Sequence, residues 1–203
     1  MISRRDRKRG HAGFSTVELV VALAIILIVG GLVIPNAQQI WFDMELKSYT
    51  AETAHLFQQA RILAAKNNQT YSLGFRVNNG VQQVWVDLNK NGSLDAGEPV
   101  IDLGRSIYAA SGAPSGSGQP SAFSYTLDTT SGTPCDNTCT LAYSPRGLPC
   151  KYDTTTTPPT CNTPAASYFV YYFQDTRPNG WSALLVTKAG RTKSLMWNGS
   201  SWH

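Results

Sequence analysis

One uninterrupted apolar run dominates the N-terminal part of the chain. Residues 19–34, LVVALAIILIVGGLVI, carry no charged side chain. Counted from Phe14, the apolar stretch is 21 residues long and is broken only by two hydroxyl residues and Glu18. As an α-helix it would measure about 31 Å, which matches the hydrocarbon core of a bilayer. The run therefore predicts a single membrane-spanning helix.

The excess positive charge of the chain lies ahead of this run. The formal net charge is +4 over 203 residues. Residues 1–13 carry five basic residues and one acidic residue, so the rest of the chain balances to zero. By the positive-inside rule, this basic cluster predicts a cytoplasmic N-terminus and an extracytoplasmic chain from Pro35 onward.

The junction ahead of the run predicts a processing site. No convincing signal-peptidase site follows residue 34, and the small residue suited to cleavage is Gly13. The segment GFSTVELVVALAIILIVGGLVIP resembles the class III leader and N-terminal helix of type IV pilins and pseudopilins. The resemblance implies that a prepilin peptidase cuts between Gly13 and Phe14 and methylates the new N-terminus at Phe14. It also implies a single-pass location in the inner membrane, followed by assembly with other pilin or pseudopilin subunits into a filament.

Glu18 is the fifth residue of the mature chain that the resemblance implies, where the family has its glutamate. A carboxylate near the hydrocarbon costs at least about 2.5–3.5 kcal/mol, so such a residue normally has a function or a partner. The resemblance supplies that partner, the free amine of a neighbouring subunit's Phe14 in the filament. The alternative is a carboxylate at the membrane interface that reaches into the headgroups.

A helical pattern continues past the apolar run, and Asn67 and Asn68 are plausible terminators. We predict an α+β fold with one long N-terminal helix, residues 14–66, packed on an antiparallel β-sheet head, residues 67–203. The first half of the helix, residues 14–34, would lie in the membrane or in the filament core.

Beyond residue 70 the pattern changes to short strands and turns. Asn78-Asn79-Gly80 between two strand-like runs is a hairpin signal. Residues 111–121 and 154–160 have the composition of loops. The predicted strands are 71–77, 81–87, 99–103, 122–127, 140–144, 168–174, 181–187 and 191–197.

A second segment, FQQARILAAKNNQTYSLGF, resembles the helix end and first strand of the FimT/GspH group of minor pilins and pseudopilins, which have an Ala-Arg pair where this chain has Ala60-Arg61. The resemblance implies a non-catalytic minor subunit of a type IV pilus or of a type II secretion-like filament. The alternatives are a major structural pilin, a DNA receptor, or a type II secretion pseudopilin that does not bind DNA. We find no G-x-S-x-G, H-E-x-x-H or P-loop motif, so catalysis is not expected.

An acidic loop, residues 87–98, fits the pattern D-x-[DN]-x-[DN]-G-x5-E of calcium-binding loops. Its oxygen-bearing positions could neutralise and coordinate Ca²⁺, although the flanking residues are predicted as strands instead of helices. The alternative is a polar hairpin loop whose Asn and Asp side chains only shape the turn. The candidate ligands are Asp87, Asn89, Asn91, Ser93 through its carbonyl, Asp95 and Glu98.

The four cysteines all lie between residues 135 and 161, with no histidine nearby. An extracytoplasmic location favours disulfides over a zinc site. Three pairings are open, and we prefer the local ones, Cys135–Cys139 and Cys150–Cys161, which need no knowledge of strand order. They would staple an irregular segment, residues 135–161.

The C-terminal region is locally basic, since no acidic residue follows Asp175. Residues 189–193, AGRTK, resemble the Gly-Arg-x-Arg element of FimT-like proteins, which is associated with DNA binding during uptake. Lysine at the last position still neutralises phosphate but lacks the bidentate fork of arginine. The alternative is a plain hairpin with solvated charges. The candidate DNA-binding residues are Lys188, Arg191 and Lys193, with Arg177 beside them and Trp181, Trp197 and Trp202 available for stacking on bases.

Overall fold

The computed structural model describes residues 15–104, 106–110, 113–117, 141–153, 159–162 and 168–203. The predicted leader, Phe14, the expected strand 122–127, and the cysteines at 135 and 139 lie outside these ranges. The chain divides into two compact units, one ending at Trp41 and the other spanning Phe42–His203.

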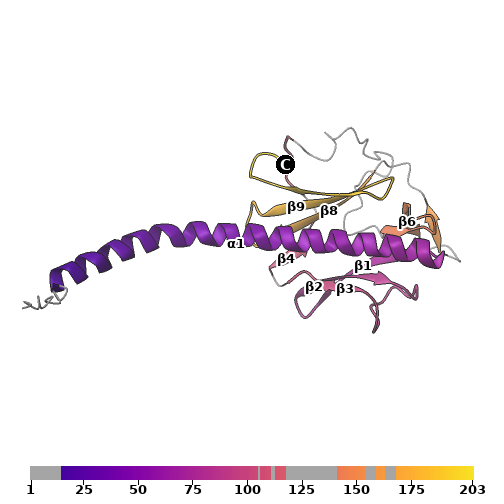
Figure 1. Cartoon of the computed structure of the whole chain (residues 1–203). Coiled ribbons are helices and arrows are strands. Elements are labelled where there is room, and N and C mark those ends of the chain that lie inside the picture. The colour runs from indigo at the N-terminus through magenta and orange to yellow at the C-terminus, as the bar shows by residue number, and fades with distance from the viewer. Residues whose placement is uncertain (1–14, 105, 111–112, 118–140, 154–158, 163–167) are drawn as a thin grey trace, which may run out of the picture. The chain divides into compact units, whose positions relative to one another are not determined.

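One long helix, α1, runs Thr16–Asn67 and contributes to both units (Figure 1). At its C-terminal end Asn68 adopts a left-handed conformation, with φ of 51°. The N–H of Gln69 then donates to the carbonyl of Ala64 at 3.1 Å. This is a Schellman arrangement, in which asparagine can take the place of glycine. Asn68, which the sequence offered as a terminator, therefore ends the helix.

The first unit is described as the helical stretch up to Trp41. Ser15 caps its start, because its Oγ accepts a hydrogen bond from the N–H of Val17 at 3.4 Å. Large apolar side chains project from it on all sides and are 51–76% exposed. These side chains are Val17, Leu19, Val20, Val21, Leu23, Ile25, Ile26, Leu27, Ile28 and Val29.

The second unit contains two antiparallel sheets and the C-terminal part of α1 (Figure 1). The six-stranded sheet has the order β3-β2-β1-β5-β6-β7, and the four-stranded sheet has the order β10-β9-β8-β4. The strands of the first are β1 (Tyr71–Asn78), β2 (Val81–Asp87), β3 (Val100–Asp102), β5 (Leu141–Tyr143), β6 (Pro149–Asp153) and β7 (Thr160–Asn162). Those of the second are β4 (Ile107–Ala109), β8 (Tyr168–Asp175), β9 (Trp181–Thr187) and β10 (Thr192–Met196).

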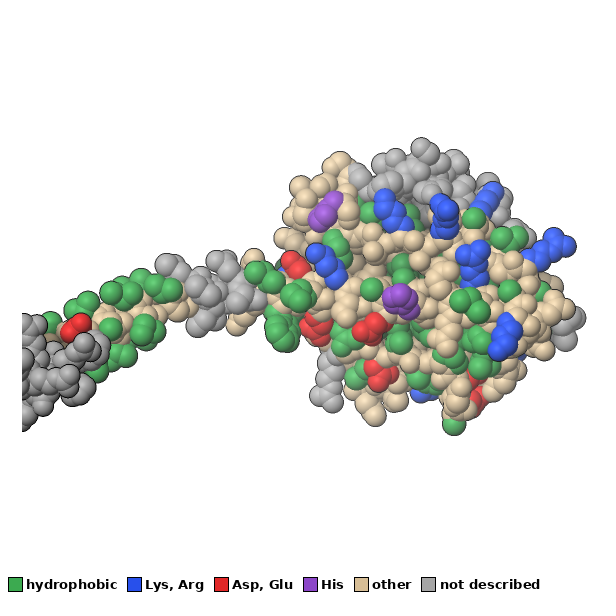
Figure 2. Space-filling view, viewed as in Figure 1, with side chains coloured by type: hydrophobic (Ala, Val, Ile, Leu, Met, Phe, Trp, Pro, Cys, Tyr) green, Lys and Arg blue, Asp and Glu red, His purple; other side chains and the backbone are tan. Residues whose placement is uncertain are grey.

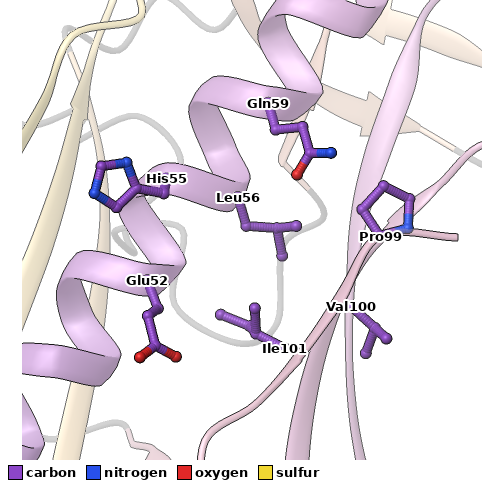
Figure 3. Close-up of a pocket in the computed structure, with 7 residues that line it drawn as sticks. All are labelled: Glu52, His55, Leu56, Gln59, Pro99, Val100 and Ile101. Atoms are coloured by element: carbon purple, nitrogen blue, oxygen red, sulfur yellow. The ribbon is translucent and has the colours of Figure 1, made fainter.

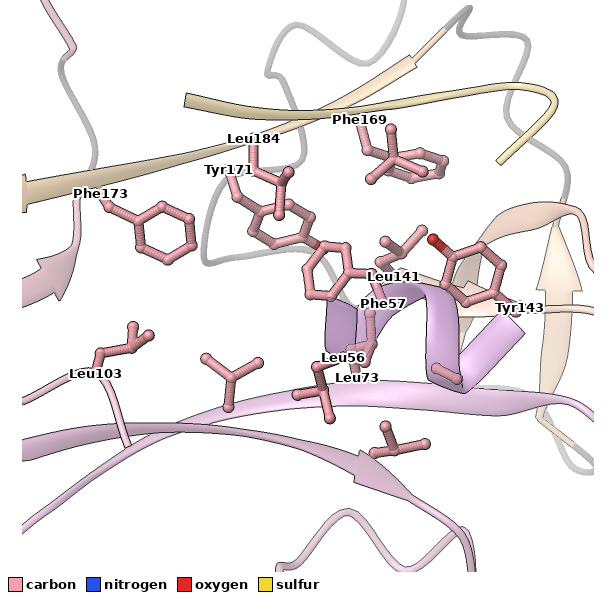
Figure 4. Packing of buried hydrophobic residues seen from close by; sticks show 14 of the residues in the cluster. Leu56, Phe57, Leu73, Leu103, Leu141, Tyr143, Phe169, Tyr171, Phe173 and Leu184 are labelled. Carbon is pink, nitrogen blue, oxygen red and sulfur yellow. The ribbon is translucent and has the colours of Figure 1, made fainter. Parts of the chain in front are cut away.

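The main core lies where α1 meets the inner faces of the two sheets (Figure 4). The buried apolar positions of the helix are Leu46, Leu56, Phe57, Ala60 and Ala64, spaced so that they share one face. The ring of Phe57 meets the ring of Tyr171 on β8 edge-to-face at 5.3 Å. The ring of Phe75 on β1 stacks on the same tyrosine at 5.1 Å, so a single side chain joins both sheets to the helix.

The structure corrects the predicted fold class on two points. Among the described residues the head is not one sheet, because β4, β8, β9 and β10 pair only with one another and form a sheet of their own. The membrane-spanning half of the helix is also not supported, because no helix among the described residues is long and apolar enough to cross a bilayer.

A second, smaller core covers the outer face of the four-stranded sheet. Trp181 and Trp202 lie in it at 7% and 4% exposure, and the indole N–H of Trp202 donates to the carbonyl of Pro114 at 3.1 Å. The C-terminal segment thus closes over the sheet, and its last residue, His203, exchanges two backbone hydrogen bonds with Met196. The expectation that these two tryptophans stack on DNA bases is wrong, because their rings are buried in this core.

We expect Phe57→Ala to lower the free energy of unfolding of the head by about 3–5 kcal/mol, because it empties the centre of the main core. The matched control is Ile62→Ala on the same helix, where the side chain is 64% exposed and the change should be within about 0.5 kcal/mol. Urea unfolding of the detergent-solubilised chain, followed by near-ultraviolet circular dichroism, measures both. Equal losses for the two variants would contradict this description of the core.

Candidate functional sites

The exposed helix of the first unit carries a single carboxylate. Glu18 is the only charged residue between Arg9 and Asp43 in the sequence, and its side chain is exposed. Among the described residues it has no ion-pair partner. The predicted cleavage junction, Gly13–Phe14, lies outside the described residues.

In the acidic loop between β2 and β3, two carboxylates accept hydrogen bonds from backbone N–H groups of the same loop. Asp87 is 2% exposed, and its Oδ1 accepts hydrogen bonds from the N–H groups of Lys90 and Asn91 at 2.7 and 3.2 Å. Its Oδ2 accepts from the N–H of Gly92 at 2.9 Å. The side chain of Asp87 therefore holds the turn that follows β2.

Glu98 closes the same loop from its other end. Its Oε1 accepts from the N–H of Leu88 at 2.8 Å, and its Oε2 accepts from the N–H of Asp95 at 3.0 Å. The side-chain amides of Asn89 and Asn91 both donate to Oδ2 of Asp95 at 2.6 Å, and these two bonds lower the pKa of that carboxyl.

This arrangement does not by itself form a cation site. The amide nitrogens of Asn89 and Asn91 face the carboxylate of Asp95, where a bound cation would need their oxygens. Within the described residues, no three His, Cys, Asp or Glu side chains come together as metal ligands. The structure thus places all six predicted ligands in one loop, including Ser93 next to Asn91, and calcium binding stays a prediction.

We expect Asp87→Asn to lower the free energy of unfolding by about 2–3 kcal/mol, because a buried, charged acceptor of backbone N–H groups is lost. The control is Asp102→Asn, an exposed carboxylate outside the loop. If the loop also binds calcium, the melting temperature of the unmodified chain rises with calcium over a chelator baseline, and that of Asp87→Asn does not. A melting temperature that does not change with calcium would contradict the calcium prediction. An Asp87→Asn variant with an unchanged free energy of unfolding would contradict the role of Asp87 in the turn.

The disulfide Cys150–Cys161 is present, as predicted, and joins β6 to β7 with 5.4 Å between the Cα atoms. Cys150 is buried against Ala142 and Tyr152 in a small cluster of its own. The link fixes two short strands at one edge of the six-stranded sheet. The other predicted pair, Cys135–Cys139, falls outside the described residues.

The predicted DNA-binding residues surround the turn between β9 and β10. Lys188, Arg191 and Lys193 are all exposed, and Gly190 in the turn has φ of 75°. The carbonyl of Arg191 accepts a hydrogen bond from the N–H of Thr187 at 2.9 Å. The hairpin therefore brings three cations of the C-terminal region together, as the sequence predicted.

Arg177 does not belong to this group, contrary to the sequence-based expectation. It lies in the turn between β8 and β9, at the other end of β9, and forms ion pairs with Asp175 and Asp43 at 2.5 and 2.7 Å. Its hydrogen bonds to Asp175 are the main cause of its raised pKa. The arginine instead ties the β8–β9 turn to α1, where its guanidinium also lies 5.3 Å from the ring centre of Phe42.

Arg61 anchors the turn between β9 and β10 to the helix. Its Nε donates to the carbonyl of Gly147 at 3.0 Å, and a terminal nitrogen donates to the carbonyl of Gly190 at 3.2 Å. Gln58, one turn earlier, donates to the same Gly190 carbonyl at 3.0 Å. In the sequence the Ala60-Arg61 pair stands out only through a resemblance, because the role of Arg61 depends on two turns that are far away in the chain.

A cavity of about 400 Å³ lies between α1 and the edge strand β3 (Figure 3). Leu56 and Ile101 point into it from the two sides, while Glu52, His55 and Gln59 line the helix side. Nothing in the sequence indicated this cavity, because it forms only where the helix and the edge strand meet.

Acidic side chains gather around Tyr49, on the same helix that lines the cavity. Burial raises the pKa of the Tyr49 hydroxyl, and the charges of Glu45, Glu52 and Asp102 raise it further. The negative charges of the three carboxylates therefore act on the same hydroxyl, although two of them come from the helix and one from β3.

Comparisons with known protein families, with curated proteins and with solved structures find no match to this chain.

Proposed function

We propose that this chain is a non-catalytic minor pilin or pseudopilin subunit of the FimT/GspH kind, working in a type IV pilus or a type II secretion-like filament. In this proposal a prepilin peptidase of the inner membrane removes residues 1–13. The subunit then joins the filament outside the cytoplasm, with its neighbours covering the N-terminal helix.

The observation that carries the proposal is the exposed apolar surface of α1 in the first unit. Ten large aliphatic side chains between Val17 and Val29 are each more than half exposed. Exposure of such a surface to water costs about 25 cal/mol of free energy for each Å² of apolar area. Soluble proteins rarely expose a continuous apolar patch of this size, so a cover by other chains is expected.

Glu18 supports the same proposal from its chemistry. Glu18 is the only charged residue of α1 before Asp43. A lone carboxylate on such a stretch of helix is stabilised best by an opposite charge when the stretch is covered, since burial of an unpaired charge is costly. The new α-amine at Phe14 of a neighbouring subunit would supply that charge. Such a pair sets the axial register of one helix against the next.

We expect Glu18→Ala to reduce incorporation into filaments at least tenfold while leaving the amount of chain in the membrane fraction unchanged. The reason is that the substitution removes the partner of the amine without reducing the apolar surface. Gln38→Ala, in the same helical stretch, is the control and should incorporate normally. Immunoblots of sheared filaments and membranes measure both, and normal incorporation of Glu18→Ala would contradict the proposed role.

Processing gives an independent test of the same proposal. Mass spectrometry of the membrane-extracted chain should find an N-terminal peptide that begins at a methylated Phe14. Substituting Gly13→Leu should block cleavage and leave residues 1–13 attached. Recovery of the intact N-terminus from cells with an active prepilin peptidase would contradict the proposal.

A second candidate function, DNA contact, is favoured by the exposed cations of the β9–β10 hairpin. We expect Lys188→Ala and Arg191→Ala each to weaken DNA binding of the detergent-solubilised chain and to flatten its salt dependence by about one counterion. Lys151→Ala, an exposed lysine on β6, is the control. The second function would be contradicted if the chain does not bind DNA at low salt, or if neither substitution changes the affinity for DNA.

A further inference from the structure

Positive charge gathers on one part of the head. Figure 2 shows most lysine and arginine side chains over one part of the visible face and most aspartate and glutamate side chains over another. Three segments of the chain contain no acidic residue at all, namely residues 53–86, 141–152 and 176–203. The fold brings parts of these three segments together around Arg61.

Two turns from different sheets are built in the same way. The turn 144–147, between β5 and β6, closes with a hydrogen bond of 2.8 Å from the N–H of its last residue to the carbonyl of its first. The turn 187–190, between β9 and β10, closes with the corresponding bond at 2.7 Å. Each turn therefore has a fixed backbone, and each carries an exposed cation, Arg146 in the first and Lys188 in the second.

Arg61 joins the two turns. Its guanidinium donates to the carbonyls of Gly147 and Gly190, the last residues of the two turns, at 3.0 and 3.2 Å. Glycine permits this approach, because a Cβ at residue 190 would lie 3.0 Å from Nε of Arg61, and a Cβ at residue 147 would lie 3.5 Å from it. The two sheets thus place Arg146 and Lys188 beside one half-buried arginine.

This packing does not neutralise the charge of Arg61. Both of its partners are uncharged carbonyls, and a guanidinium has five N–H groups, of which these bonds use two. Arginine side chains suit the oxygens of a phosphate, because the planar fork can donate two bonds at once. Among the described residues, no carboxylate forms an ion pair with Arg61, Arg146, Lys188 or Arg191.

We propose that the two turns and the arginine between them form one binding site for the backbone phosphates of DNA. The site, which we call the two-turn site, consists of Arg61, Arg146, Lys188 and Arg191. This inference deepens the second candidate function, DNA contact, and rests on it. It extends the contact from the β9–β10 turn to the six-stranded sheet through Arg146, which no pattern in the sequence indicated. Arg61 is the positioning residue, since it holds both turns and adds its charge.

The two-turn site contacts the DNA backbone and does not stack on bases. Residues 58–66, 144–148 and 187–193 contain no aromatic side chain, and stacking on aromatic rings is a main source of affinity for single strands. A duplex carries a dense row of phosphates, with one charge for about every 1.7 Å of its axis. We therefore expect duplex DNA to bind at least as tightly as single strands of the same length. Tighter binding of single strands would overturn this mode of contact.

Substitution of Arg146 tests whether the six-stranded sheet takes part. We expect Arg146→Ala to weaken duplex binding by the detergent-solubilised chain about threefold at low salt and to flatten its salt dependence by about one counterion. The matched control is Arg76→Ala, an exposed arginine on β1 outside both turns, which should bind normally. Unchanged affinity and salt dependence in Arg146→Ala would overturn the two-turn site.

Chemical modification of the unsubstituted chain supplies a second measurement. Phenylglyoxal reacts with accessible guanidinium groups, and mass spectrometry of the peptides locates the products. We expect duplex DNA to protect Arg146 and Arg191 over the same range of DNA concentrations, while Arg76 stays reactive. Protection of Arg191 without Arg146 would overturn the two-turn site.

The same measurement tests the positioning role of Arg61. Arg61→Lys keeps the charge but loses the planar fork that binds both carbonyls. We expect the protection of Arg146 and that of Arg191 to require different DNA concentrations in this variant, because the two turns are no longer held to each other. Joint protection that persists in Arg61→Lys would overturn the positioning role.

The DNA contact and the two-turn site fail in different ways. If Lys188→Ala and Arg191→Ala weaken binding while Arg146→Ala does not, the DNA contact stands and the two-turn site is overturned. If the chain does not bind DNA at low salt, both are overturned. The proposed filament role depends on neither result, because Glu18→Ala and the processing of the N-terminus test it separately.

Discussion

The packing of the C-terminal part of α1 between two sheets is the contact on which the rest of the head depends. Phe57 and Tyr171 join the helix to β8, and a buried hydrogen bond of 2.7 Å joins Thr50 to Ser182 on β9. Arg61 then ties the helix to one turn from each sheet. The same helix therefore positions the turn between β9 and β10 and forms one wall of the cavity beside β3.

The sequence predicts those parts of the fold that depend on residues close together in the chain, namely a helix end, a turn, two apolar strands and a disulfide. Asn68 ends the helix through its left-handed backbone, and Asn79 and Gly80 form the β1–β2 turn with positive φ. Strands with long apolar runs, such as β8 and β9, were placed within one residue of their observed bounds. The disulfide Cys150–Cys161 followed from proximity in the chain.

The features that the sequence did not predict depend on long-range contacts. Strand β4 has three residues and exists because it pairs with β8, far along the chain. Strands β6 and β7 carry Pro149 and a disulfide and show no alternating pattern that would mark them. Tertiary packing, which no short stretch of sequence contains, produces the division into two sheets, the anchoring role of Arg61 and the cavity between α1 and β3.

We propose above all that other chains cover the apolar helix of the first unit in a filament. It can be tested with a spin label attached to Ile26→Cys, compared with a label at Ile62→Cys on the exposed face of the head, in filaments sheared from cells and washed free of membrane. We expect the label at residue 26 to be shielded from a water-soluble paramagnetic relaxation agent and the label at residue 62 to be accessible to it. A label at residue 26 that is as accessible as the label at residue 62, or absence of the labelled chain from the filaments, would contradict it.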